Sequence, residues 1–130
     1  MVVKRVILDT NMLMVPGSLG VDIFAELDRI MMHPFEVVVL QSSLDELAAL
    51  AEEGKVVDRK AAKLALQLVQ RKPLKIAQGS SALYVDDQIV EMAGKDVLVA
   101  TVDSALKARV RRKGASVITL KQKKYLVEVA

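Results

Sequence analysis

Four acidic residues stand where an apolar, strand-like run gives way to a turn or to the start of a helix. They are Asp9, Glu46, Asp86 and Asp103, and Asp87 follows directly after Asp86. In a parallel α/β sheet such positions share the carboxyl edge, so carboxylates that are far apart in the sequence converge there. Carboxylate oxygens are preferred ligands of hard divalent cations. The pattern therefore predicts an acidic pocket that binds Mg²⁺ or Mn²⁺.

Strand-like and helix-like segments alternate along the chain, which favours a doubly wound α/β sheet with right-handed crossovers. Apolar runs predict strands at residues 2–8, 35–40, 74–77, 96–100 and 116–120. Amphipathic runs predict helices at about 18–33, 43–53, 58–71, 87–93 and 104–113, with loops at 16–17 and 78–81. Residues 125–129 are a candidate edge strand.

Length and composition narrow the class of protein. The 130 residues, 52% of them hydrophobic, fit one compact domain over 1–130, with 121–130 as a peripheral tail or edge strand. The chain has no cysteine and a single histidine, His33, which disfavours zinc and excludes disulfide and thiolate chemistry. There is no signal-peptide pattern and no apolar run near the roughly 18 residues of a membrane span. We expect a cytoplasmic protein without a membrane partner.

The formal charge of +3 is modest, but cations gather in the C-terminal third of the chain. The basic set consists of Lys107, Arg109, Arg111, Arg112, Lys113, Lys121, Lys123 and Lys124. A basic region beside an acidic pocket suits a polyanionic substrate held for metal-assisted chemistry. The alternative interpretation is a solvated helix face followed by a charged tail.

Each acid also has a purely structural interpretation, because Asp and Ser cap helices. Ser43 and Glu46 have the spacing of a capping box. Asp86 and Asp103 precede helical segments as N-caps would, and Asp9 has the setting of an Asx turn after a strand. Independent caps need not fall at one edge of a sheet, whereas a metal site requires it. The joint arrangement favours the metal site.

Four segments resemble, in order and spacing, the acidic motifs of the PIN-domain nuclease family. They are Ile7-Leu8-Asp9-Thr10-Asn11, Leu44-Asp45-Glu46-Leu47, Val85-Asp86-Asp87-Gln88-Ile89-Val90 and Ala100-Thr101-Val102-Asp103-Ser104-Ala105-Leu106-Lys107. Together they cover nearly the whole chain. The resemblance implies a three-layer α/β/α sandwich with a parallel sheet of order 3-2-1-4-5, and a Mg²⁺- or Mn²⁺-dependent endoribonuclease.

The resemblance also implies roles for individual residues. The family's acidic quartet matches Asp9, Glu46, Asp86 and Asp103, and its supporting polar positions match Asn11 and Thr101, with Asp87 as an additional acid. On this basis Asp9 and Asp103 would bind the principal ion and Asp86 would bind or share it. Glu46 would either complete a second site or orient the attacking water.

The expected reaction is in-line hydrolysis of an RNA phosphodiester by a metal-activated water. The resemblance implies products with a 5′-phosphate and a 3′-hydroxyl. The basic set would contact RNA phosphates, giving salt-sensitive and weakly sequence-selective binding. The aromatic residues are Phe24, Phe35, Tyr84 and Tyr125, and the first two are expected in the core. We therefore expect no base-stacking platform.

Several functions remain open at this point. The paired aspartates and the basic helix resemble PIN proteins of ribosomal-RNA processing more than toxins, so a housekeeping endoribonuclease with a ribosome-assembly partner is the first hypothesis. The second is a VapC-type toxin ribonuclease controlled by an antitoxin, and the third is a non-catalytic scaffold that binds RNA or protein. An acyl-phosphate receiver domain fits less well, because no early acidic pair precedes Thr10. We expect a homodimer.

Overall fold

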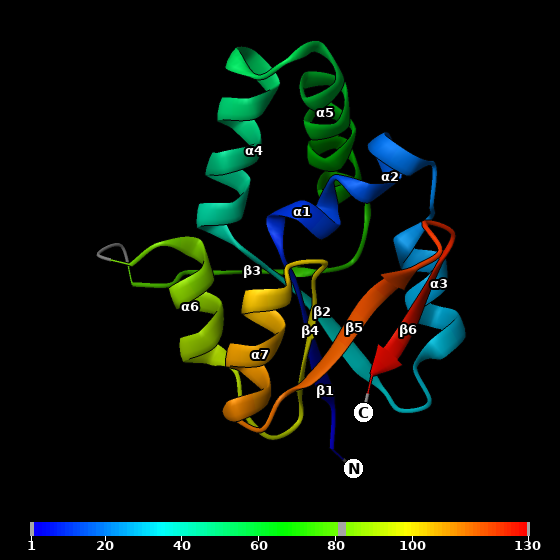
Figure 1. Ribbon diagram of the computed structural model, residues 1–130, viewed down its shortest axis with the longest axis vertical. Coiled ribbons are helices and arrows are strands. Elements are labelled where there is room, and N and C mark those ends of the chain that lie inside the picture. Colours follow the sequence, from blue (N-terminus) through cyan, green and yellow to red (C-terminus); the bar gives the residue numbers. More distant parts are fainter. Residues whose placement is uncertain (1, 81–82, 130) are drawn as a thin grey trace.

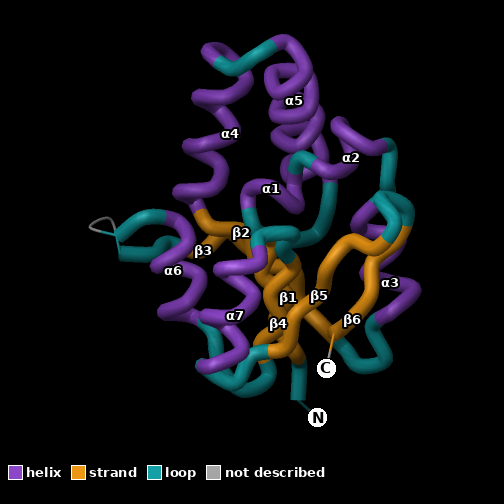
Figure 2. Tube along the Cα trace, viewed as in Figure 1, coloured by secondary structure: helices purple, strands orange, loops and turns teal. Residues whose placement is uncertain are grey.

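A six-stranded sheet lies at the centre of the computed structural model, which describes residues 2–80 and 83–129. Its strands are β1 (Lys4–Leu8), β2 (Phe35–Leu40), β3 (Lys75–Ala77), β4 (Val97–Ala100), β5 (Ser116–Lys121) and β6 (Tyr125–Val129). Their order is β3-β2-β1-β4-β5-β6, and all are parallel except β6, which runs antiparallel to β5 (Figures 1 and 2). The predicted order 3-2-1-4-5 is confirmed, and β6 extends the sheet beyond β5.

Helices cover both faces of this sheet. They are α1 (Thr10–Leu13), α2 (Val15–Leu19), α3 (Ile23–Ile30), α4 (Gln41–Glu53), α5 (Val56–Arg71), α6 (Val85–Met92) and α7 (Ser104–Arg112). Alternate residues of β1 face opposite layers, as the two-residue period of a strand requires. Val6 and Leu8 pack in the core formed with α1 to α5, whereas Ile7 packs with α6 and α7. The predicted three-layer α/β/α sandwich is confirmed.

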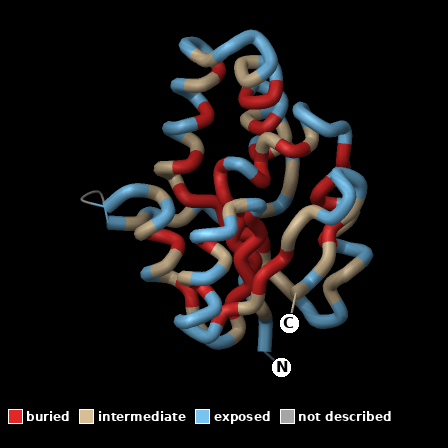
Figure 3. Tube along the Cα trace, in the orientation of Figure 1, coloured by how far each residue is buried: buried red, intermediate tan, exposed pale blue. Residues whose placement is uncertain are grey.

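Burial is deepest in the central strands, which Figure 3 shows as a continuous buried band. β1 lies between β2 and β4 and pairs with both, so its apolar side chains are covered on both faces. Leu8 at the end of β1 pairs with Ala100 at the end of β4. The residues that follow these two strands therefore emerge at the same edge of the sheet. None of the helices in the described part of the chain is long and apolar enough to cross a membrane.

The single helix predicted over 18–33 is wrong, because the chain forms two helices there. Pro16 lies at the start of α2, where its missing N–H costs no hydrogen bond, instead of in a loop. Gly20 ends α2 with a left-handed φ of 70°. Asp22 then begins α3 by accepting a 3.0 Å hydrogen bond from the Ala25 N–H. A glycine stop followed by an aspartate cap is a local signal that outweighs the apolar periodicity across it.

Three helices begin two residues earlier than predicted: α5 begins at Val56, and the shifts of α4 and α6 each move an acidic residue of the candidate site relative to its helix. α4 begins at Gln41, directly after β2, and not at Ser43. α6 begins at Val85, so Asp86 lies inside its first turn. The other predicted elements match in type, with ends that differ by one or two residues. The predicted loop at 78–81 ends on Ser81, which lies outside the described residues.

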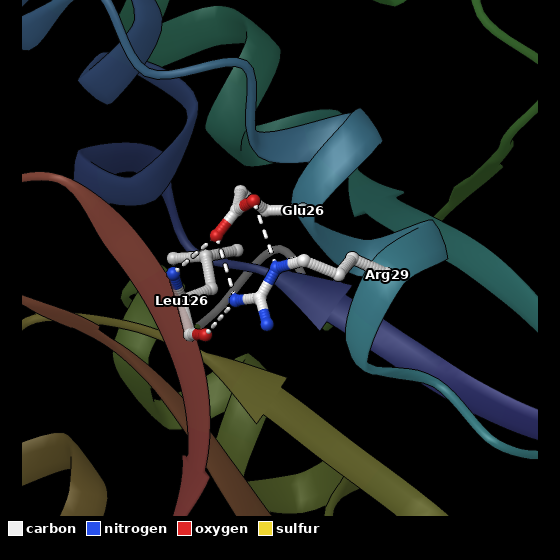
Figure 4. Close-up of polar contacts among 3 residues, drawn as sticks. All are labelled: Glu26, Arg29 and Leu126. Carbon is white, nitrogen blue, oxygen red and sulfur yellow. Dashed lines mark hydrogen bonds and ion pairs between the residues drawn. The ribbon is translucent and has the colours of Figure 1, made fainter.

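The outer edge of β6 is held by α3. Glu26 and Arg29 form an ion pair of 2.9 Å on the surface of α3. The Leu126 N–H donates to Glu26 Oε1, and Arg29 Nη2 donates to the Leu126 carbonyl oxygen, both at 2.9 Å (Figure 4). Two side chains thus satisfy backbone groups that an unpaired edge strand would expose. This contact fixes the β5–β6 hairpin against the body of the protein.

Candidate active site

Asp9 forms the floor of the candidate site at the end of β1. Its side chain is only 3% exposed. One carboxylate oxygen accepts from the Thr10 N–H and the other accepts from the Thr101 hydroxyl, both at 2.8 Å. The first of these bonds caps α1. A buried carboxylate with both oxygens hydrogen-bonded has a fixed orientation.

Thr101, at the end of β4, connects Asp9 to Asp103. It is fully buried, and its hydroxyl oxygen accepts a 3.0 Å hydrogen bond from the Asp103 N–H while its proton goes to Asp9. One hydroxyl therefore links the Asp9 carboxylate to the backbone of Asp103. The supporting position predicted from the sequence makes this contact.

Asp103 is the N-cap of α7, and Oδ1 accepts a 3.0 Å hydrogen bond from the Leu106 N–H. The structural interpretation of this residue is confirmed. Its negative charge nevertheless raises the pKa of both Asp9 and Asp86. Capping orients the carboxylate at the edge of the sheet without removing its charge from the acidic cluster.

Asp86 approaches the same place from α6. Because α6 starts at Val85, Asp86 is not the N-cap, and that alternative is wrong. Burial raises the pKa of Asp86, the charges of Asp103 and Asp87 raise it further, and Arg109 opposes the increase. For Asp9, burial raises the pKa most, then the charges of Asp86 and Asp103, against the hydrogen bonds from Thr101 and Thr10. Three carboxylates from three elements therefore repel one another.

Glu46 joins the site through Thr10. The Thr10 hydroxyl donates a 2.7 Å hydrogen bond to Glu46 Oε1. The proposed capping box with Ser43 is wrong, since α4 begins two residues before Ser43, which places both residues inside the helix. Glu46 is consequently available at the exposed rim of the pocket. The structure brings the four predicted acids to one edge of the sheet, while their catalytic roles stay a prediction.

Thr10 links two of the acids, and the sequence pattern did not predict it as a site residue. It is buried, and it bonds to Asp9 through its backbone and to Glu46 through its side chain. The predicted supporter Asn11 is instead exposed on α1. The signal was available in part, because Thr10 follows Asp9, whose backbone is bonded to the end of β4 at the sheet edge.

Asp87, predicted as an additional acid, points to a different partner. Its Oδ1 accepts from Arg109 Nη2 at 2.7 Å, which ties α6 to α7. Arg109 was predicted to contact RNA, but its guanidinium is engaged in this ion pair. The pair holds α6 against α7 and so helps to place Asp86 beside Asp103.

The predicted basic set does not form one surface. α7 starts at the carboxyl edge of the sheet and runs to the opposite edge, so Arg111, Arg112 and Lys113 lie at its far end from Asp103 (Figure 1). Lys123 and Lys124, in the β5–β6 turn, line a hollow together with Asp22 and Glu26 of α3. Lys107 is the cation of α7 nearest to Asp103 along the helix, and its N–H bonds to the Asp103 carbonyl oxygen. Among the cations on α7, Lys107 is therefore the best placed to meet a substrate at the acids.

The donor chemistry of the site fits a hard divalent cation. Carboxylates that raise one another's pKa are stabilised by a positive ion between them. Within residues 2–80 and 83–129, however, no three acidic side chains stand close enough to chelate an ion by themselves. Mg²⁺ commonly keeps several waters and is bound by only one or two carboxylates. The set therefore suits an ion held partly by carboxylates and partly through water.

Comparisons with known proteins agree with this architecture. Residues 6–123 match the family described as "PIN like domain". The chain is 28% identical over 123 residues to ribonuclease VapC4 of Methanocaldococcus jannaschii, which covers 93% of each chain. The solved PIN domain endonuclease Utp24 matches 94% of this chain and 88% of its own, with a TM-score of 0.76 and 25% identity. A domain of a functionally unknown protein from Methanocaldococcus jannaschii matches 98% of each chain at a TM-score of 0.61 and 15% identity, which bears on the fold alone.

Proposed function

Because the chain belongs to the PIN-like domain family, we propose that it is an endoribonuclease that hydrolyses RNA phosphodiesters with a carboxylate-bound Mg²⁺ or Mn²⁺. The observation that carries the proposal is the convergence of Asp9, Asp86 and Asp103 at one edge of the sheet, where their charges raise the pKa of Asp9 and Asp86. Such an arrangement is unfavourable for folding, so a function that needs the clustered charge accounts for it. Similarity to VapC4, named a ribonuclease, and to Utp24, named an endonuclease, supports the same reaction class.

The acids would have different roles, some binding the metal ion and one orienting the attacking water. Asp9 would hold the ion, with Asp86 and Asp103 supplying further oxygens directly or through water. The bound cation would lower the pKa of a coordinated water and neutralise charge on the phosphate. Thr101 keeps the Asp9 carboxylate oriented, and Thr10 holds Glu46 at the rim, where it can orient the attacking water. Lys107 would contact a neighbouring phosphate of the RNA strand.

Two biological roles are candidates for this endoribonuclease, and they differ in the RNA that is cleaved. The paired aspartates Asp86 and Asp87 and the basic α7 favour an enzyme of ribosomal-RNA processing that acts in the cytoplasm. The similarity to VapC4 favours a toxin ribonuclease with an antitoxin partner. Growth arrest on expression, together with co-purification of a short acidic protein, would select the toxin. Neither candidate changes the chemistry proposed for the site, and a homodimer is compatible with both.

The direct test is a cleavage assay with structured and single-stranded RNA. The wild-type protein should cleave with Mn²⁺ or Mg²⁺ and stop with a chelator, and the Asp9→Asn variant should be inactive under all conditions. Glu128→Gln, which removes an exposed acid from β6, is the matched control and should cleave normally. Cleavage by Asp9→Asn that persists in chelator would refute the proposal, and inactive wild-type protein would favour the non-catalytic scaffold.

Metal binding has a separate readout in thermal unfolding. A ligand that binds only the folded state at 100 times its Kd stabilises that state by about 2.7 kcal/mol. Saturating Mn²⁺ should therefore raise the Tm of the wild-type protein and of Glu128→Gln, but leave that of Asp9→Asn nearly unchanged. An equal rise in all three proteins would place the ion elsewhere.

A further inference from the structure

A groove of about 650 Å³ opens between α4 and the start of α6. Glu46 lines it from α4 and Asp86 lines it from α6, so the groove is continuous with the proposed catalytic acids. Its volume falls within the roughly 300 to 1,000 Å³ of pockets that bind small molecules. A nucleotide next to the scissile phosphate would have its base near this groove.

The aromatic ring in the groove is exposed to an unusual degree. Tyr84, directly before α6, is 85% exposed, and its neighbour Leu83 is 37% exposed. Both line the groove together with Ala49 of α4. An exposed aromatic side chain contributes nothing to the core, but it offers a flat apolar face to a ligand. Its place beside the acids makes that face useful for substrate.

The negative charge of the groove determines which part of an RNA strand can bind in it. Asp45, Glu46 and Asp86 all line the groove, and their carboxylates would repel a phosphate. An uncharged planar group avoids this repulsion and can stack on Tyr84. A nucleobase has both properties, and every base has a π-face that an aromatic side chain can contact.

Two hydrogen bonds of the Gln88 side chain connect the two sides of the groove. Ser42 Oγ donates to Gln88 Oε1, and Gln88 Nε2 donates to the Leu83 carbonyl oxygen, both at 2.8 Å. Gln88 is only 4% exposed, and any side chain at Gly79 would collide with its amide. The amide therefore ties α4 to the residue before Tyr84. The ring is carried on a backbone that is fixed relative to Glu46.

We propose that this groove binds one unpaired nucleobase of the RNA substrate, stacked on Tyr84, while the adjacent phosphate lies at the acids. The proposal rests on the proposed endoribonuclease function and deepens it. It also revises the expectation that the protein has no base-stacking surface, since a single exposed ring suffices for one base. Tyr84 thereby selects single-stranded over fully paired RNA at this position.

The chain contains no tryptophan, so Tyr84→Trp introduces a unique fluorescent indole into the groove. In chelator, a short single-stranded oligoribonucleotide should quench this fluorescence, whereas an abasic strand with the same backbone should not. Met32→Trp is the matched control, because Met32 is 86% exposed and lies in the loop before β2, at the opposite edge of the sheet. Equal responses to both strands, or an equal response at residue 32, would overturn stacking on this ring.

Kinetics provide the second test and separate the two proposals. Tyr84→Ala should raise KM about 10-fold with kcat within about twofold, while Tyr84→Phe, which keeps the ring, should retain the wild-type KM. The effect should disappear on an abasic substrate. Active wild-type enzyme with an unchanged KM in Tyr84→Ala would refute the base site alone. Wild-type protein that never cleaves, together with base-dependent quenching in Tyr84→Trp, would refute the nuclease and leave the base site intact.

Discussion

The Thr101 hydroxyl donates a 2.8 Å hydrogen bond to Asp9, although the two residues are 92 positions apart in the chain. The same oxygen accepts from the Asp103 N–H at 3.0 Å. Because β1 and β4 are neighbours in the sheet, residues that follow them meet at one edge. A single buried hydroxyl thus couples two of the proposed catalytic acids, and it can be removed without changing the shape of the side chain.

Thr101→Val should reduce both activity and stability. The substitution leaves Asp9 Oδ2 and the Asp103 N–H without the hydrogen bonds that Thr101 supplies, and the loss of a buried partner costs about 1–3 kcal/mol. Residues that orient metal ligands change activity by roughly 10- to 100-fold when they are replaced. Cleavage kinetics and thermal unfolding measure the two effects. Thr101→Ser keeps the hydroxyl and should restore most of both; a Val variant with wild-type kinetics would show that Thr101 does not position Asp9.

Asp9→Asn should make the metal-free protein more stable at neutral pH. The pKa of Asp9 is raised in the folded state, so the ionised carboxylate opposes folding. Below the unfolded pKa of about 4 both states are protonated and the penalty is absent. As the pH rises between the unfolded and folded pKa values, the unfolded chain loses its proton first and stability falls.

We expect Asp9→Asn to be more stable than the wild type, with a higher Tm, at pH 7 in chelator. The difference should shrink as the pH falls toward about 4. Calorimetry across this pH range is the measurement. The stability of the variant minus that of the wild type should be larger at pH 7 than at pH 4. The opposite order would contradict the proposed repulsion.

Lys107→Ala should weaken RNA binding more than Arg112→Ala. Both cations are on α7, but Lys107 lies one turn from Asp103, whereas Arg112 is the last residue of the helix. Loss of one phosphate contact should lower the slope of log K against log salt by about 1 and reduce affinity at all sequences. Binding to single-stranded RNA in chelator at several salt concentrations tests this. If the two variants show the same salt dependence of RNA binding, Lys107 does not contact a phosphate.

Arg29→Ala should loosen the β5–β6 hairpin. Hydrogen bonds from Arg29 and then from the Leu126 N–H lower the pKa of Glu26. A lowered carboxyl pKa contributes stability above the unfolded value, and that contribution is lost as the pH falls through the folded value. Hydrogen exchange at the Leu126 amide should therefore accelerate in Arg29→Ala at neutral pH. In the wild type the contact should weaken only in acid, below about pH 4.5. Unchanged exchange in the variant would make the contact dispensable.

Much of the fold could be read from the sequence because its signals are local. Runs such as Val97–Ala100 are apolar at every residue, as strands covered on both faces must be. Alternation of such runs with helices leaves few topologies for a parallel sheet. The division of residues 18–33 at Gly20 was missed, since periodicity over a long window conceals a local stop that the glycine and Asp22 together produce.

The acids themselves were also identifiable, because each follows or closely follows a predicted strand or opens a helix. The residues that contact these acids were harder to identify from the sequence. Thr10 and Asn11 are adjacent polar residues, and only the path of the chain after β1 buries Thr10 against Glu46 and exposes Asn11. In the same way, the eight cations looked like one surface in the sequence, but the direction of α7 and the β5–β6 turn separate them.

The sequence by itself determined the order of the elements, the parallel sheet and the four carboxylates at its edge, because strand burial and chain connectivity are encoded residue by residue. Tertiary structure alone decided which side chains meet across that edge: Thr101 with Asp9, Thr10 with Glu46, Arg109 with Asp87, and Tyr84 beside the acids. These contacts depend on where helices start and how they turn over the sheet. A shift of a single residue rotates a helical side chain by about 100°, which is enough to change its partner.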